Sequence, residues 1–314
     1  MKKILCIGGV TADIIVSPVD SVPEPGTLRA VQSTSMHVGG CAANAAIDLA
    51  KLGIRPVLCC KVGKDSFGEF VLKQTESAGV DTSGIICSPD IATTTSVVCV
   101  SSEGERSFLY TPGSTAALHA QDIPLHLIDR CDIVFVAGAM LLSEFDGEPC
   151  RRILEYGRSK GKFTVMDTAW DFDDVWLPKI EPVLAALDLF MPSYEEAVHL
   201  SGKTDPAEIA DFLIGKGVKN VIIKLGNQGA YFCPEGEEGF VLPTYRKIKP
   251  VDTTGAGDSF CAGFLCGLTQ GWNFQQSGAF ANAVGTHCIQ AIGASAGIRP
   301  IAEILKFMET TPLE

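Results

Sequence analysis

The stretch Asp252-Thr253-Thr254-Gly255-Ala256-Gly257-Asp258 is the most informative part of the chain, and the predicted fold is worked out from it. Two glycines flank an alanine, an acid follows, and a helical pattern continues to Leu268. Glycine lets the backbone turn tightly and approach a ligand closely. A helix that begins near Ala256 points unpaired N–H groups and the positive end of its dipole outward, which suits an anion such as phosphate. The segment therefore predicts an anion site with Asp258 in the first helical turn.

Asp258 lies where a carboxylate would repel a phosphate group, so its presence needs a reason. One role that fits is that of a general base, which accepts the proton of an attacking hydroxyl group. The alternative is a plain turn in which Asp258 only stabilises the helix dipole. The preceding Asp252, Thr253 and Thr254 make the pattern more specific than a lone Gly-x-Gly-Asp.

The surrounding sequence alternates between short apolar runs and helix-like segments. Strands are predicted at 3–7, 57–62, 133–137, 163–166, 187–191 and 221–224. Helices are predicted at 41–52, 67–77, 257–268 and 274–290. This alternation is typical of an α/β fold in which helices cover a mostly parallel sheet. Two runs at 230–233 and 239–242 predict an antiparallel hairpin at one edge of that sheet.

Two segments interrupt the α/β alternation. Residues 13–36 contain three prolines and Gly26, and residues from about 91 to 113 have the pattern of two strands joined by a turn. The simplest account is that both leave the main sheet and build a small β lid on a single domain, 1–314. Because an apolar-faced lid often pairs with another copy, a homodimer through the lid is also predicted.

Composition limits the class of protein. The chain has 314 residues, 46% of them hydrophobic, and a net charge of −12. It contains no run of Lys and Arg that could neutralise phosphates along a duplex or an anionic membrane, so neither is expected as a partner. The 12 cysteines form no CxxC pair, which argues against a zinc site. No apolar stretch reaches about 18 residues, and we expect a cytoplasmic protein with reduced thiols.

The segment 252–258 resembles the C-terminal signature of the ribokinase-like, PfkB-type carbohydrate kinases. The stretches 37–46, 62–68 and 225–229 are similar to other parts of the same family, in the same order. Coverage is therefore nearly full length. The resemblance implies a ribokinase-like three-layer sandwich with a mostly parallel central sheet. It also implies an enzyme that uses ATP and Mg²⁺ to phosphorylate a hydroxyl of a sugar or sugar derivative.

The resemblance assigns roles to particular residues of this chain. Asp258 would be the catalytic base, and the backbone of Gly255, Ala256 and Gly257 the anion hole. The sugar-like acceptor would be bound by Asp13, Gly39, Gly40 and Asn44. The nucleotide would be bound by Lys224, Gly226, Gly229 and Asn282. Glu196 would hold Mg²⁺ through water, and Asp252 with Thr254 would hold a monovalent cation such as K⁺. The position of Asp13 also fits on physical grounds, because ligands of open α/β sheets gather at the carboxyl ends of strands.

The sequence departs from the family pattern at one position, and three functions other than a sugar kinase have to be considered. Ser193 stands where the family usually has Asn, and serine is also a common helix N-cap. A nucleoside kinase of the same fold would need an aromatic clamp, for which Phe108, Tyr110 and Trp170 are available. A non-catalytic sugar sensor would be favoured by loss of Asp258 or the glycines, and all are present. A dinucleotide-binding oxidoreductase is disfavoured because no G-x-G-x-x-G joins the first strand to a helix.

Overall fold

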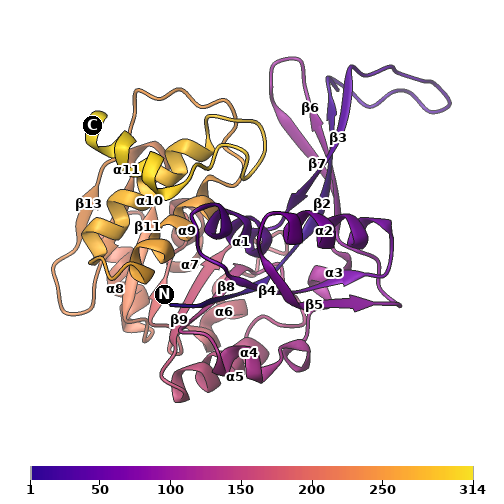
Figure 1. Cartoon of the computed structure of the whole chain (residues 1–314). Helices are drawn as coiled ribbons and strands as arrows, with labels where there is room; N and C mark the ends of the chain where they lie inside the picture. Colours follow the sequence, from indigo (N-terminus) through magenta and orange to yellow (C-terminus); the bar gives the residue numbers. More distant parts are fainter. Residues whose placement is uncertain (1, 314) are drawn as a thin grey trace.

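The computed structural model describes residues 2–313, and one large sheet runs through this part of the chain (Figure 1). Its strand order is β13-β12-β11-β10-β9-β8-β1-β4-β5. The strands are β1 Ile4–Gly8, β4 Val57–Gly63, β5 Asp81–Ser88, β8 Ile133–Ala139, β9 Phe163–Thr168, β10 Leu189–Phe190, β11 Asn220–Lys224, β12 Ala230–Cys233 and β13 Phe240–Leu242. All neighbours from β11 to β5 are parallel, whereas β12 and β13 form an antiparallel edge. The mostly parallel sheet and the hairpin at its edge are confirmed.

The large sheet separates two hydrophobic cores, because successive side chains of a strand point to opposite faces. In β1, Ile4 and Cys6 belong to one core, and Leu5 and Ile7 belong to the other. Strands that are buried on both faces are apolar throughout, which explains why the sequence shows continuous apolar runs.

Each core is closed by a layer of helices. The first layer consists of α1 Cys41–Lys51, α2 Ser66–Ser77, α9 Ala256–Thr269, α10 Phe274–Cys288 and α11 Ile301–Thr310. The second consists of α4 Leu125–Asp129, α5 Glu148–Ser159, α6 Leu177–Leu184, α7 Tyr194–Ser201 and α8 Pro206–Gly215. The result is the predicted three-layer sandwich. Within residues 2–313, no helix has both the length and the apolar character needed to cross a membrane.

A separate small sheet projects from the sandwich beside α1 and α2 (Figure 1). Its strands, in the order β3-β2-β6-β7, are β2 Thr11–Ser17, β3 Ser33–Gly39, β6 Thr95–Val100 and β7 Arg106–Thr111. The two sequence segments that interrupt the α/β pattern therefore do leave the main sheet. Their strands extend further than predicted, because β2 starts at Thr11 and β3 continues to Gly39, directly before α1.

Candidate active site

The turn before α9 forms an open cradle of backbone donors. Gly255 is the N-cap in the left-handed region, with φ of 75°, and no side chain caps the helix. A Cβ atom at Gly255 would lie 2.6 Å from the Cβ of Ala294, so this position requires glycine. The first-turn N–H groups of a helix have no intrahelical acceptor. Because Ala256 and Gly257 are only half-buried, these donors can reach a ligand.

Asp258 lies in the first turn of α9 and contacts the predicted acceptor residue Asn44. The Nδ2 amide of Asn44 donates a hydrogen bond of 2.8 Å to Oδ2 of Asp258. Burial raises the pKa of Asp258, while the Asn44 hydrogen bond and the charge of Lys224 oppose that shift. The Oδ1 of Asn44 is buried and accepts no hydrogen bond from residues 2–313. A ligand hydroxyl could satisfy this oxygen, and it would then stand beside Asp258.

Lys224, at the end of β11, brings a positive charge to the cradle. Its Nζ lies 2.6 Å from Oδ1 of Asp167, and both side chains are almost fully buried. The same Nζ would lie 3.3 Å from a Cβ atom built on Gly257. Burial raises the pKa of Asp167, and the positive charge of Lys224 opposes that shift. Asp167 therefore holds an ammonium group against the backbone that was predicted to form the anion hole.

Asp13 and Gly39 meet at the base of the small sheet. A Cβ atom at Gly39 would lie 2.0 Å from Oδ2 of Asp13, so only glycine leaves room for this carboxylate. Gly40 is the N-cap of α1, the helix that carries Asn44. Burial raises the pKa of Asp13 to about 6. The structure thus places all four predicted acceptor residues where the small sheet joins α1.

One face of the small sheet is turned toward this junction. Asp13 pairs with His37 and Ser96, and Ser96 pairs with Tyr110, so these side chains form one row on one face. Burial raises the pKa of Tyr110 to about 12, and nearby Cys41 and Asp13 add to this rise. Phe108 and Arg106, which precede Tyr110 in β7 by two and four residues, point to the same face.

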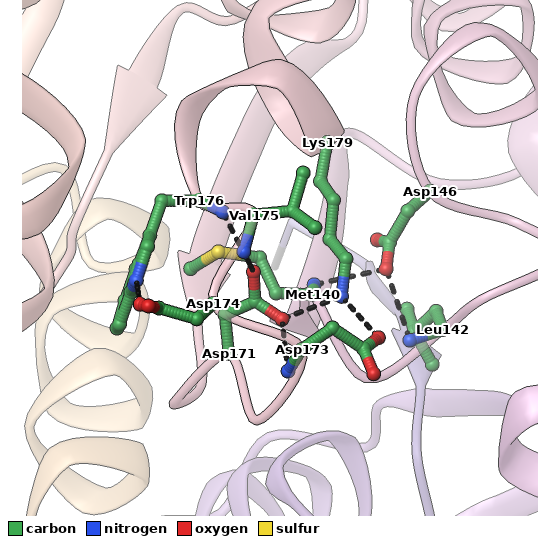
Figure 2. A network of polar contacts seen from close by, with 9 residues as sticks. All are labelled: Met140, Leu142, Asp146, Asp171, Asp173, Asp174, Val175, Trp176 and Lys179. Carbon is green, nitrogen blue, oxygen red and sulfur yellow. Dashed lines mark hydrogen bonds and ion pairs between the residues drawn. The ribbon is translucent and has the colours of Figure 1, made fainter.

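A tightly bonded loop follows β9 on the other side of the junction. Figure 2 shows Asp171 at its centre, accepting hydrogen bonds from the N–H groups of Val175 at 2.8 Å and Trp176 at 2.6 Å. Lys179 reaches both Asp171, at 2.5 Å, and Asp173, at 2.7 Å. Asp171 therefore closes the loop, which the sequence resemblance alone did not reveal.

The loop is tied to the end of β8, because the N–H of Ala169 donates a hydrogen bond of 2.9 Å to the carbonyl of Ala139, and it carries exposed aromatic side chains. Asp146 accepts hydrogen bonds of 3.0 Å from the N–H groups of Met140 and Leu142 (Figure 2). Trp170 and Phe172 project from the loop, with 53% and 55% of their surface exposed. The ring of Phe172 lies 6.4 Å from that of Tyr110 in β7. The small sheet and the loop therefore face each other through aromatic rings.

The predicted nucleotide residues line one cavity of about 370 Å³ beside the cradle. Its walls include Lys224, Gly226, Gly229 and Asn282 together with Ala256 and Gly257. The Nδ2 of Asn282 donates to the carbonyl of Pro243 at 2.9 Å, which fixes the wall that follows β13. Sequence reasoning missed other lining residues, among them Thr244, Tyr245, Arg246, Pro250 and Thr286.

Glu196 and Ser193 form a capping box at the start of α7. Ser193 accepts from the N–H of Glu196 at 3.3 Å, and Glu196 Oε2 accepts from the N–H of Ser193 at 2.9 Å. Thr168 donates a further hydrogen bond of 2.8 Å to Oε2. Ser193 is thus a helix cap. The charge of Glu196 contributes to the raised pKa of both Lys224 and Asp258, so the carboxylate belongs to the same cluster of charged groups beside the cradle.

The carboxylate of Asp252 is surrounded by donors. Oδ1 lies 2.5 Å from a guanidinium nitrogen of Arg106 and accepts the N–H of Thr254 at 2.8 Å. Oδ2 accepts the N–H of Gly293 at 2.8 Å. Burial alone would raise the pKa of Asp252, but these hydrogen bonds lower it below its usual range. The monovalent cation expected at Asp252 and Thr254 does not fit this arrangement, because a guanidinium already occupies the carboxylate.

The sandwich, the small sheet and the cradle together define the ribokinase fold. Arabidopsis thaliana ribokinase, solved with ribose and ATP, has a TM-score of 0.86 at 23% identity over 97% of this chain and 98% of its own. An Escherichia coli protein solved with ATP and Mg²⁺ has a TM-score of 0.85 at 24% identity over 99% of this chain and 100% of its own.

A family model extends the likeness from the fold to the sequence. The model of the pfkB family carbohydrate kinases matches residues 1–301, and the chain belongs to this family. The 2-dehydro-3-deoxygluconokinase of Bacillus subtilis (strain 168) is 31% identical over 91% of this chain and 90% of its own length. The family resemblance is confirmed, and the oxidoreductase alternative is set aside.

Proposed function

We propose that this protein transfers the terminal phosphoryl group of ATP to a hydroxyl of a sugar or sugar derivative. The observation that carries the proposal is the contact between Asn44 and Asp258, with the unsatisfied Oδ1 of Asn44 beside it. A hydroxyl that donates to this Oδ1 would lie next to a buried carboxylate and near the donors of the α9 turn. That is the geometry which transfer of a phosphoryl group to an alcohol requires.

Each part of the site has a role in this reaction. Asp258 would take the proton of the attacking hydroxyl, and its raised pKa makes it a stronger base than an exposed aspartate. The N–H groups of Ala256 and Gly257, with the ammonium of Lys224, would stabilise the charge on the transferring group. Mg²⁺, held through water by Glu196, would supply further charge neutralisation between the phosphates.

The nucleotide would occupy the cavity lined by Lys224, Gly226, Gly229 and Asn282. Its position beside Ala256 and Gly257 would direct the end of a bound triphosphate toward the cradle. The ATP in the Arabidopsis and Escherichia coli structures supports ATP as the nucleotide.

The aromatic rings around the acceptor site favour a nucleoside as the second candidate acceptor. The rings of Tyr110 and Phe172 form a tilted pair, 6.4 Å apart, beside the site, and Phe108 shares the face of Tyr110. Rings in this arrangement can stack on a nucleobase or on the apolar face of a sugar ring. The polar contacts from Asp13 and Asn44 suit the hydroxyls of either acceptor.

The function is tested by supplying ATP and Mg²⁺ with a panel of ketoses, aldoses, sugar acids and nucleosides. We expect ADP to form only with one acceptor class, and phosphorus NMR to identify a phosphate ester. Asp258→Asn serves as the control for contaminating kinases. A sugar that binds by calorimetry but is never phosphorylated would instead support the non-catalytic sensor.

The small sheet also supports a proposed homodimer. The face opposite Asp13 and Tyr110 carries Ile14, Val16 and Leu109, of which Leu109 is 66% exposed. An exposed apolar face of a sheet is a common interaction surface. Light scattering should give twice the chain mass, and Leu109→Lys should give the monomer.

A further inference from the structure

Arg106 connects the small sheet to the cradle. It is the first residue of β7, and one of its guanidinium nitrogens lies 2.5 Å from Oδ1 of Asp252. The side chain of Asp252 is 2% exposed and that of Arg106 is 25% exposed, so water screens this ion pair only weakly. A buried carboxylate requires a partner charge, and Arg106 provides it.

Asp252 in turn holds the cradle in shape. Its Oδ1 accepts the N–H of Thr254, the residue before Gly255, and its Oδ2 accepts the N–H of Gly293. Gly293 is followed by Ala294, whose Cβ leaves no space for a side chain at Gly255. One carboxylate therefore fixes both the turn that opens α9 and the loop that packs against this turn.

A monovalent cation at this carboxylate would have the same two effects as Arg106 and the surrounding hydrogen bonds. It would neutralise Asp252 and pull the surrounding backbone together. The two oxygens of Asp252 already accept two N–H groups and a guanidinium, so a cation bound there would stand beside the positive charge of Arg106 and be repelled by it. We propose that Arg106 replaces a monovalent cation in this protein, as a fixed positive charge that holds Asp252 and the cradle.

The replacement has a consequence for the small sheet. Arg106 and Tyr110 are four residues apart in β7 and point to the same face, toward the acceptor site. Strand β7 therefore carries both Arg106, whose charge orders the cradle, and Tyr110, which faces the acceptor site. Arg106 is a positioning residue: it acts on the transferring group only through Asp252 and the turn. The catalytic part of this inference rests on the proposed function, whereas the replacement of the cation does not.

The test compares the wild type with Arg106→Gln in potassium chloride and in choline chloride at equal ionic strength. Melting temperature is measured first, because it requires neither substrate nor activity. The wild type should melt at the same temperature in both salts. Arg106→Gln should melt lower in choline and gain roughly 2–4 °C in potassium, since a bound ion stabilises only the folded state.

The turnover number is then measured with the acceptor found in the screen. Potassium should leave the wild type unchanged and raise the turnover of Arg106→Gln about tenfold, whereas Arg106→Lys, which keeps the charge, should not need potassium. Arg29→Gln is the matched control, because Arg29 is an exposed arginine that donates its hydrogen bonds to Ser21, in the loop between β2 and β3.

Two results would overturn the inference. One is a wild type that potassium stabilises or activates, and the other is an Arg106→Gln variant that potassium leaves unchanged. If Arg106→Gln does not fold in either salt, the inference is tested by the wild type alone, whose melting temperature and turnover must be the same in potassium and in choline. Failure of every acceptor in the screen would count against the proposed function but would leave the melting experiment valid.

Discussion

The amide of Asn44 donates a hydrogen bond of 2.8 Å to the carboxylate of Asp258, and so joins α1 to α9. Helix α1 carries Asn44, which the resemblance assigns to the acceptor, and α9 carries Asp258, which it assigns as the catalytic base. Because Asn44 uses its nitrogen for Asp258, its Oδ1 is left for the ligand.

Asn44→Ala should weaken acceptor binding by about 1–3 kcal/mol, since a ligand hydroxyl loses its hydrogen-bond acceptor. Nucleotide affinity should stay within about twofold, because Asn44 does not line the nucleotide cavity. Asn282→Ala is the matched control and should weaken the nucleotide instead. Calorimetry with each ligand measures both constants. An Asn44→Ala variant that loses nucleotide binding while keeping the acceptor would reverse the assignment of the two sites.

Asp13 should make acceptor binding depend on pH. Its pKa is raised to about 6 by burial, so the carboxylate becomes protonated as the pH falls through 6. The protonated form accepts hydrogen bonds less well, and the KM for the acceptor should rise about tenfold between pH 7 and pH 5. In Asp13→Asn the KM should be higher at pH 7 but nearly independent of pH. An unchanged pH profile in this variant would show that another group titrates.

Substitutions at Lys224 and Asp167 should show that the two residues affect stability and catalysis in different ways. Lys224→Met leaves the buried Asp167 carboxylate without its partner and should lower the free energy of unfolding by about 3–5 kcal/mol. The double variant Lys224→Met/Asp167→Asn removes both charges and should recover most of that stability. It should stay nearly inactive, because no ammonium then faces Gly257. Urea unfolding and steady-state turnover test the two halves, and an active double variant would rule out a direct role for Lys224.

The small sheet should tighten over the acceptor and not over the nucleotide, while Arg106 stays paired with Asp252. Tyr110 and Asp13 face the acceptor junction, whereas the nucleotide cavity lies beyond Gly257. Hydrogen exchange of residues 91–113 should therefore slow with a verified acceptor and stay unchanged with a nucleotide analogue. Equal protection by the nucleotide alone would contradict the idea of a lid while leaving the kinase proposal intact.

Most of the sandwich could be predicted from the sequence, because strands that are buried on both faces appear there as continuous apolar runs. Strand β5 was missed because Asp81–Ser88 lies at the edge and mixes polar residues and Gly84 with its apolar ones. The predicted strand 187–191 shrinks to Leu189–Phe190. Pairing with neighbouring strands limits its length, and sequence periodicity does not report such pairing.

The candidate site could be predicted only where glycine or a local motif marks it. Gly255 has a left-handed φ of 75° that favours glycine, and Gly39 and Gly257 are recognisable because they belong to the two motifs that resemble the family. The pairing of Asp167 with Lys224 and that of Arg106 with Asp252 were not predicted, because each pair joins two strands that are distant in the sequence or a strand and a distant turn, and no local pattern records such a contact. The glycine at 39 was assigned to the acceptor, and the structure adds that it makes room for Asp13.

The central claim is that Asp258 removes the proton from the acceptor hydroxyl, and the turnover of Asp258→Asn tests it most directly. Asparagine preserves the shape and still faces Asn44, but it cannot accept a proton. We predict that turnover falls by roughly 10²–10⁴-fold with the same acceptor affinity. An Asp258→Asn enzyme that keeps more than about a tenth of the wild-type turnover would contradict the assignment.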